Sequence, residues 1–315
     1  MLTYIAVFVV VLNFDFILPR IAPGNAAETL SAGYTSPQLE KALLEQRFGL
    51  NHPLIVQYYH YLTGIFTQFP PNFGFSFQYY PTPVSVLLET RIGWTIGLIL
   101  VSLALAFIIA YSMVVVTALR RGGKGETTST ISSILLQATP VYFSGLIILW
   151  VFSIAFNWFP AFGKFTIGAT GLNYVTSVIR HGVLPVVTLT AGILGQYYLL
   201  LRGSVQETLK SDYVSAASLR GLTERRISTR YVLRNALIPV ISVVSFSLAT
   251  LVSLAVLVEA VFGYAGLGDL VVDAAINRDY PTLEGSLFVI TIMIIVGGLI
   301  GDIALTRLDP RLRSL

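Results

Sequence analysis

Few side chains in this sequence have the types and spacing that metal or nucleophilic chemistry requires. The three histidines are His52, His60 and His181, and none has zinc-site spacing with another ligand. The sequence has no cysteine, no P-loop and no GxSxG nucleophile elbow. Asp15 and Asp302, the two candidates for an intramembrane aspartyl protease, lie near opposite ends of their apolar runs, so they cannot meet. We therefore expect no enzyme, no catalytic residue, and no metal or cofactor bound by this chain.

The composition predicts a protein that lies mostly in lipid. Only 11% of its 315 residues are charged, whereas a soluble domain carries about 25%. Its mean hydropathy is +0.75. Apolar runs of about 20 residues are long enough to span a bilayer as helices. We expect six transmembrane helices, at about residues 1–19, 92–119, 131–159, 184–201, 236–262 and 283–305.

Basic residues set the expected orientation, because they mark the cytoplasmic side of a membrane protein. Of the 20 lysines and arginines, thirteen lie in the loops after the second and fourth runs and in the C-terminal tail. We therefore expect both termini to be cytoplasmic, and we read the net charge of +4 as a mark of topology rather than of nucleic-acid binding. The first run lacks the basic start of a signal peptide, so we expect an uncleaved anchor.

These runs divide the chain into a first transmembrane helix at 1–19, an extracytoplasmic segment at 20–89 and a five-helix core at 90–315. The extracytoplasmic segment contains SPQLEKALLEQRFGL, which predicts a short helix that Ser36 caps and Gly49 ends. An aromatic stretch, FPPNFGFSFQYYPTP, follows. Interfacial packing explains these aromatic residues, and a docking surface for an outside partner is the alternative.

Within the core, a basic cytoplasmic segment at 206–235 separates the fourth and fifth runs. The stretch SDYVSAASLRGLTERRISTRYVLRNALIP, residues 211–239, covers most of this segment and carries five arginines. Asp212 or the serine before it can cap a first helix, Gly221 can break it, and Thr223 can cap a second helix. A helix–glycine–helix element under the membrane has the shape of a segment that docks into a groove on a neighbour. A solvated loop that touches anionic lipid is the alternative.

Polar residues on the fifth run and beyond it are the candidates for a transport pathway. Small polar residues in membrane helices serve helix packing or line a pathway. Two acidic residues, Glu259 and Asp279, lie toward the outside and could form charge pairs, an outer gate or a contact for a binding protein. The glycine run GYAGLG at 263–268 lacks the strand–turn–helix setting of a phosphate site, so we expect an outer turn there. The pathway candidates are Ser242, Ser245, Thr250, Ser253, Glu259 and Asp279.

The basic segment resembles the coupling loop of ABC-transporter permeases, whose pattern is E-A-A-x-x-x-G with a distant proline. Here the pattern reads Ser215-Ala216-Ala217-x-x-x-Gly221. Serine replaces the glutamate and Pro239 is more distant, and both departures resemble the oligopeptide/dipeptide branch. Other stretches resemble the B-type permease of that branch in the same order: LPRIAPGNA, RFGLNHPLIVQYYHYL, FGFSF, LRRG, VEAVFGYAGLGDL, INRDYP and LDPRLR.

This resemblance implies an all-α polytopic membrane protein with the type I ABC importer permease fold. It implies a second, C-type permease subunit, two ATPase subunits that bind ATP and Mg²⁺, and an extracytoplasmic solute-binding protein. The implied substrates are oligopeptides or dipeptides, with oligosaccharides or nickel complexes as alternatives. The residues that the resemblance assigns to ATPase coupling are Asp212, Tyr213, Ser215, Ala216, Ala217, Gly221, Leu222, Arg225, Arg226, Asn235 and Pro239.

Two other classes of protein remain as alternatives. A stand-alone channel or secondary transporter should contain inverted repeats and ionisable groups at the bilayer midplane, and the sequence has neither. A membrane receptor or scaffold could use the extracytoplasmic segment, but this reading leaves the coupling pattern unexplained.

Overall fold

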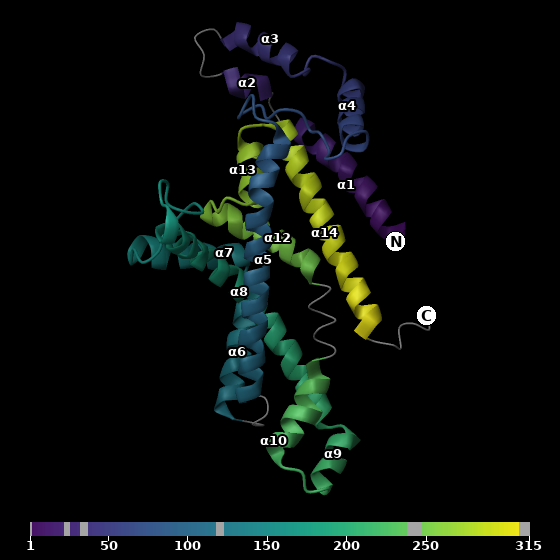
Figure 1. The fold of residues 1–315 in the computed structure, drawn as a ribbon, viewed down its shortest axis with the longest axis vertical. Coiled ribbons are helices and arrows are strands. Elements are labelled where there is room, and N and C mark those ends of the chain that lie inside the picture. The colour runs from purple at the N-terminus through teal and green to yellow at the C-terminus, as the bar shows by residue number, and fades with distance from the viewer. Residues whose placement is uncertain (1, 22–25, 32–36, 118–122, 238–246, 309–315) are drawn as a thin grey trace. The chain divides into compact units, whose positions relative to one another are not determined.

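The computed structural model describes residues 2–21, 26–31, 37–117, 123–237 and 247–308, and most of these are helical (Figure 1). Within these ranges, the β-type pairing is an isolated bridge between Phe75 and Pro83. Among the described residues, four helices are long and apolar enough to cross a membrane, and the number rises to six if each of two bent helix pairs is one span. The expectation of an all-α polytopic protein is therefore confirmed.

The four unbroken candidate spans are helices near or above the length that a bilayer needs. A helix rises 1.5 Å per residue, so about 20 residues cross the hydrocarbon core. Their bounds are α1, Leu2–Ile21; α5, Val84–Thr117; α8, Gly171–Leu209; and α14, Tyr280–Leu308. Helix α8 extends well beyond the apolar run at 184–201 and includes the more polar residues on either side of that run.

The first bent pair corresponds to the third apolar run, where one transmembrane helix was expected and the structure has a break. Helix α6 spans Lys124–Ala138, and α7, Val141–Leu149, continues into the π-helix η1, Trp150–Ala155. The two parts meet at 100°. Thr139 is extended, with ψ 125°, because a following proline disfavours the helical conformation. Pro140 therefore breaks the span.

The second bent pair surrounds the glycine run. Helix α12, Leu248–Phe262, ends at Gly263, whose φ of +49° is left-handed, and α13, Leu267–Ile276, follows in the sequence. The structure thus confirms the predicted turn. Residues 238–246, at the start of the fifth apolar run, lie outside the described residues.

The chain forms two compact units. Unit 1 comprises residues 1–96 and 265–295, and unit 2 comprises residues 97–264 and 296–315. Unit 1 also contains the short helices α2, Ala26–Ser31; α3, Pro37–Arg47; and α4, Leu54–Phe66. Helix α3 confirms the predicted helix, and Gly49 follows it with φ +66°. The cap assigned to Ser36 lies outside the described residues.

An apolar cluster joins α1 to α4 within unit 1. Leu12 and Phe16 of α1 are buried against Tyr61 and Ile65 of α4. Phe288 of α14 packs on the same cluster. Segments from both ends of the sequence therefore share one core.

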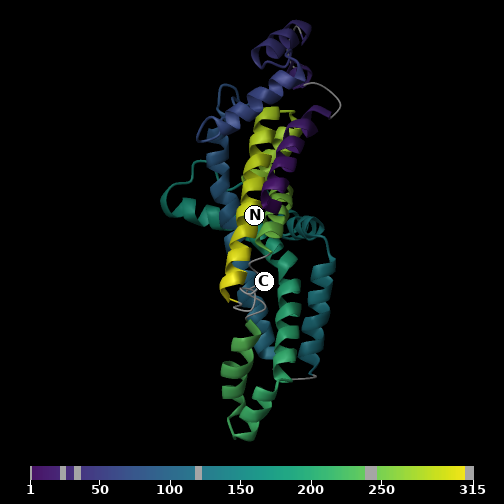
Figure 2. The same ribbon diagram turned by 90° about the vertical axis from the view of Figure 1, so that its right-hand side faces the viewer.

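In unit 2, α8 packs against α6, α7 and α12 (Figure 2). Two glycines of α8 permit a close approach. A Cβ atom at Gly195 would lie 2.3 Å from the backbone oxygen of Ser133 in α6. A Cβ atom at Gly192 would lie 2.8 Å from a methyl group of Val141 in α7. The sequence AGILG at 191–195 therefore fits α8 to both sides of the break at Pro140.

Candidate functional site

The basic segment of unit 2 folds as two short helices separated by a glycine. Helix α9 spans Asp212–Leu219, and α10, Glu224–Arg226, continues into the π-helix η2, Ile227–Leu233. Ser211 and Thr223 occupy the predicted N-cap positions with extended backbones, although neither side chain makes a capping hydrogen bond. Instead, the Ser211 hydroxyl donates to the carbonyl of Thr208 at 2.5 Å.

Gly221 closes α9 through a left-handed turn. Its φ is +73°, its N–H donates to the carbonyl of Ser218 at 2.9 Å, and the N–H of Leu222 donates to the carbonyl of Ala217 at 3.3 Å. These two bonds form a Schellman motif, which favours glycine at this position. A Cβ atom at Gly221 would meet nothing within 4 Å. The turn therefore requires glycine because of its conformation rather than because of crowding within the chain.

The two faces of α9 differ sharply in burial. Val214 and Ala217 are buried, and α9 contacts η2, whose Val232 and Leu233 are also buried. On the other face Leu219 is 90% exposed. Tyr213 of the same helix is 44% exposed, so two large apolar side chains of α9 are left uncovered by the rest of the described chain. Most of the predicted coupling residues are also exposed: Asp212, Tyr213, Ser215, Ala216, Gly221, Arg225, Arg226 and Asn235. Leu222 is half-buried, and Pro239 lies outside the described residues.

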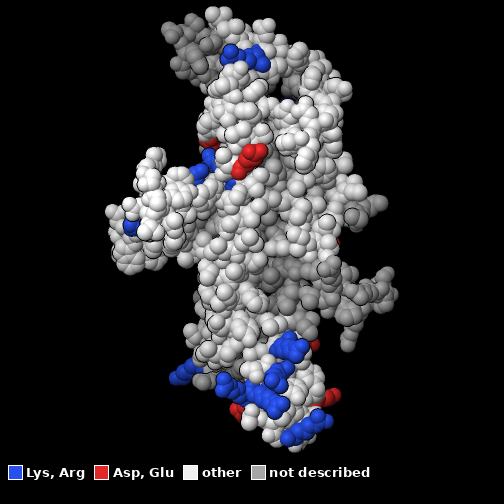
Figure 3. Space-filling model, viewed as in Figure 1, with Lys and Arg blue, Asp and Glu red and all other residues white. Residues whose placement is uncertain are grey.

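Positive charge gathers at the end of unit 2 that carries α9 and α10 (Figure 3). Arg225, Arg226 and Arg230 line a surface cavity of about 450 Å³ together with Thr223 and Thr229. Their guanidinium groups offer many hydrogen-bond donors in a fixed, planar arrangement. This surface is suited to contact acidic groups.

Buried polar contacts brace this end of unit 2. Glu126, in the first turn of α6, forms an ion pair with Arg202 Nη2 at 2.9 Å and accepts hydrogen bonds from Arg202 Nε at 3.0 Å and from Gln206 at 2.9 Å. The Ser204 hydroxyl donates to the carbonyl of Ala236 at 2.8 Å. The sequence analysis missed these residues, because an acid in the first turn of a helix does not reveal which distant base it pairs with.

The described pathway candidates differ in burial and belong to both units. Thr250 and Ser253 are exposed and lie three positions apart on α12, so they share one face. Glu259 is fully buried on the same helix. Asp279 belongs to unit 1. The remaining two candidates, Ser242 and Ser245, lie outside the described residues.

Asp279 anchors a loop of unit 1 to the start of α14. Its carboxylate is fully buried and accepts hydrogen bonds from the Ser76 hydroxyl, the Phe77 N–H at 3.0 Å and the Gln78 N–H at 3.4 Å. The Thr282 hydroxyl donates to it at 2.7 Å. The carboxylate thus holds the aromatic stretch in place.

A second contact holds the same loop. The Tyr79 hydroxyl donates to Asp273 of α13 at 2.7 Å. Burial, and then the hydrogen bond to this carboxylate, raise the pKa of Tyr79 to about 12. The phenol is therefore protonated, as its role of donor requires.

Comparison with known proteins identifies relatives across the whole sequence. Residues 102–314 match the family described as binding-protein-dependent transport system inner membrane component, and residues 1–99 match the N-terminal model of such membrane components. A probable peptide ABC transporter permease protein of Sinorhizobium fredii is 34% identical over 98% of this chain and 96% of its own length. An oligopeptide transport system permease protein of Bacillus subtilis is 33% identical over 95% and 92%. A dipeptide transport system permease protein of Alkalihalophilus pseudofirmus is 28% identical over 95% and 93%.

Proposed function

The chain belongs to the family of binding-protein-dependent transport system inner membrane components, and we propose that it forms half of the translocation pathway of an ATP-driven peptide importer. Membership makes it an ABC-transporter permease of the inner membrane with several membrane-crossing helices. Beyond family membership, we propose the number and direction of the spans, the partner subunits and the substrate.

We propose six spans with both termini in the cytoplasm, each bent pair being one span. The asymmetry of basic residues supports this topology. Contacts within unit 1 support it as well. Arg20, near the end of α1, forms an ion pair with Glu284, in the first turns of α14. The two helices therefore run in opposite directions, as a first and a last span must if both termini are on the same side.

The exposed face of α9 is the observation that carries the proposed mechanism. Leu219 projects from a helix that Gly221 closes and η2 supports, beside a surface of arginines. We propose that this element docks on a separate ATPase subunit, which binds ATP and Mg²⁺. A second, C-type permease would supply another such element for a second ATPase. Movement of the ATPases would then shift a braced segment rather than a loose loop, as alternating access requires.

We propose that peptides are the substrate. The three relatives described above are named for peptides, oligopeptides and dipeptides, which favours peptides over the oligosaccharides or nickel complexes that the sequence left open. A solute-binding protein would deliver the peptide from outside.

The docking proposal is tested by replacing Leu219 with aspartate in the assembled transporter. A carboxylate on an apolar docking face must be desolvated without a partner, so we expect at least tenfold less ATPase to co-purify with the tagged chain. The control is Leu172→Asp, at the opposite end of α8, where the side chain is 84% exposed. Mass spectrometry of the purified complexes measures the subunit ratios. Equal recovery of the ATPases with both variants would contradict the proposed docking surface.

A further inference from the structure

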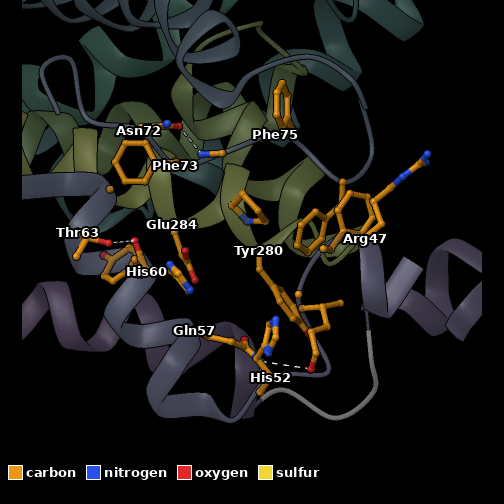
Figure 4. A pocket seen from close by; sticks show the side chains of 18 of the residues that line it. Arg47, His52, Gln57, His60, Thr63, Asn72, Phe73, Phe75, Tyr280 and Glu284 are labelled. Carbon is orange, nitrogen blue, oxygen red and sulfur yellow. Dashed lines mark hydrogen bonds between the residues drawn. The ribbon is translucent and has the colours of Figure 1, made fainter. Parts of the chain in front are cut away.

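Unit 1 contains a cavity of about 630 Å³, within the range of about 300–1,000 Å³ that small-molecule sites occupy. Five segments line it, namely the end of α1, the end of α3 with the turn after it, α4, the loop after α4 and the start of α14 (Figure 4). His60 and Thr63 come from α4, Asn72 and Phe75 come from the loop that follows, and Tyr280 comes from the start of α14. The cavity lies where α1 ends and α14 begins, at one end of two candidate spans.

Aromatic rings that hold one another in place form one wall of the cavity. Phe48 and Phe77 stack with their centroids 4.2 Å apart. Tyr80 meets Phe48 edge to face at 6.0 Å, and Tyr280 lies 6.1 Å from Phe77. The hydrogen bonds from the loop to Asp279 fix Phe77 further. Such a wall is preformed for an aromatic or apolar group.

The charged groups at the cavity are already paired. Arg20 binds Glu284, donates to the carbonyl of Phe16 at 2.7 Å and donates to Gln57 at 3.2 Å. The guanidinium of Arg47 lies 4.8 Å from the centroid of the Tyr80 ring, and its side chain extends away from the other labelled residues (Figure 4). The cavity therefore suits a neutral ligand better than a free carboxylate or ammonium group.

Two imidazole rings remain available for hydrogen bonding. His52 and His60 line the cavity, and neither ring forms a hydrogen bond with another described residue. By contrast, the side-chain amide of Gln57 donates to carbonyls of the turn before α4. The side-chain amide of Asn72 forms hydrogen bonds with Gln68 and with the N–H of Gly74 in the loop. A neutral imidazole has one donor and one acceptor, which match the C=O and N–H groups of a peptide backbone.

We propose that this cavity binds a segment of the transported peptide. An aromatic or apolar side chain would lie on the wall of Phe48, Phe77 and Tyr280, and neutral backbone amides would face the two histidines. The permease would thereby select among peptides itself, outside the translocation pathway. This inference rests on the proposal that peptides are the substrate.

The test measures peptide binding to the assembled permease–ATPase complex in nanodiscs, without its solute-binding protein. The probes are acetyl-Ala-Phe-Ala-amide, its serine counterpart acetyl-Ala-Ser-Ala-amide, and maltotriose, each in equilibrium dialysis. We expect the phenylalanine peptide to bind at least tenfold more tightly than the serine peptide. His60→Trp, which fills the cavity, should weaken binding at least tenfold. Tyr59→Trp is the matched control, because Tyr59 is the neighbouring α4 residue, is 65% exposed and does not line the cavity.

The remaining outcomes each overturn the inference. These are the absence of saturable binding, equal binding to the His60→Trp variant, and preferential binding of maltotriose. If His60→Trp does not assemble, His60→Ala should still weaken binding through the lost hydrogen bond. Peptide uptake by proteoliposomes with the solute-binding protein separates this inference from the proposed function. Normal uptake without direct binding refutes the cavity alone, whereas no peptide uptake by the wild type refutes the substrate assignment.

Discussion

Replacement of Asp279 by alanine should release the aromatic loop of unit 1 from α14. The carboxylate accepts three backbone N–H groups and two hydroxyls in a fully buried position. Each buried donor left without an acceptor costs about 1–3 kcal/mol. Because the hydroxyls can turn to other acceptors and the N–H of Gln78 lies at 3.4 Å, most of the loss comes from the N–H of Phe77 and from the lost charge-assisted bonds. We expect the loop to be destabilised by about 3 kcal/mol.

Hydrogen exchange measures this effect at the amides concerned. A loss of about 3 kcal/mol raises the local opening equilibrium by roughly 150-fold, since about 1.4 kcal/mol corresponds to a factor of ten. Exchange of peptides that cover residues 73–80 should therefore accelerate by about two orders of magnitude, through local opening. The control is Tyr79→Phe, which removes the hydrogen bond from the Tyr79 hydroxyl to Asp273 and should destabilise the loop by about 1 kcal/mol. Equal protection of Phe77 and Gln78 in the wild type and the Asp279 variant would refute this reasoning.

Three further predictions concern glycines and a tyrosine. Gly195→Ala should lower the midpoint of thermal unfolding in detergent by several degrees, because the new Cβ would lie 2.3 Å from a backbone oxygen of α6. The control is Gly203→Ala, which faces open space and should leave the midpoint unchanged or raise it. Gly221→Ala should destabilise the turn after α9 by about 1–2 kcal/mol, because the φ of Gly221 is +73°, and Gly221→Asn should destabilise it less. Peptide uptake per ATP hydrolysed measures the consequence for coupling. Because the pKa of Tyr79 is raised to about 12, the Tyr79 hydroxyl should stabilise the fold by a constant amount below pH 10 and by less as the pH rises from 10 to 12. A Tyr79→Phe variant should lack this loss of stability in denaturation experiments.

Local chemistry allowed the basic segment to be predicted well. The extended backbones at Ser211 and Thr223 and the left-handed turn at Gly221 are properties of residue types that act within a few positions of themselves. The break of the third span follows from the same kind of local signal, because Pro140 disfavours a helical Thr139, although the sequence analysis did not use it. The π-helical form of η2 has no comparable signal in the residues that form it.

Long-range partners could not be predicted. The sequence analysis assigned Asp279 to charge pairing or gating, whereas its described partners are Ser76, Phe77, Gln78 and Thr282. Three of these lie about 200 positions earlier, and no local pattern connects them to INRDYP. The cavity was equally hidden, because an aromatic stretch has the same composition whether it faces lipid or surrounds a binding site.

The division of unit 1 between the two ends of the sequence has a consequence for biosynthesis. Residues 1–96 leave the ribosome first, and residues 265–295, which complete the unit, leave it almost 200 residues later. At about 5–20 residues per second, the early part waits roughly 10–40 s for its counterpart. During this time Ser76 and Phe77 lack their acceptor, and Arg20 lacks Glu284. Ribosome stalling or truncation before residue 265 therefore leaves the first part of the unit exposed to proteases and chaperones, and elongation through α14 sets the time at which this region matures.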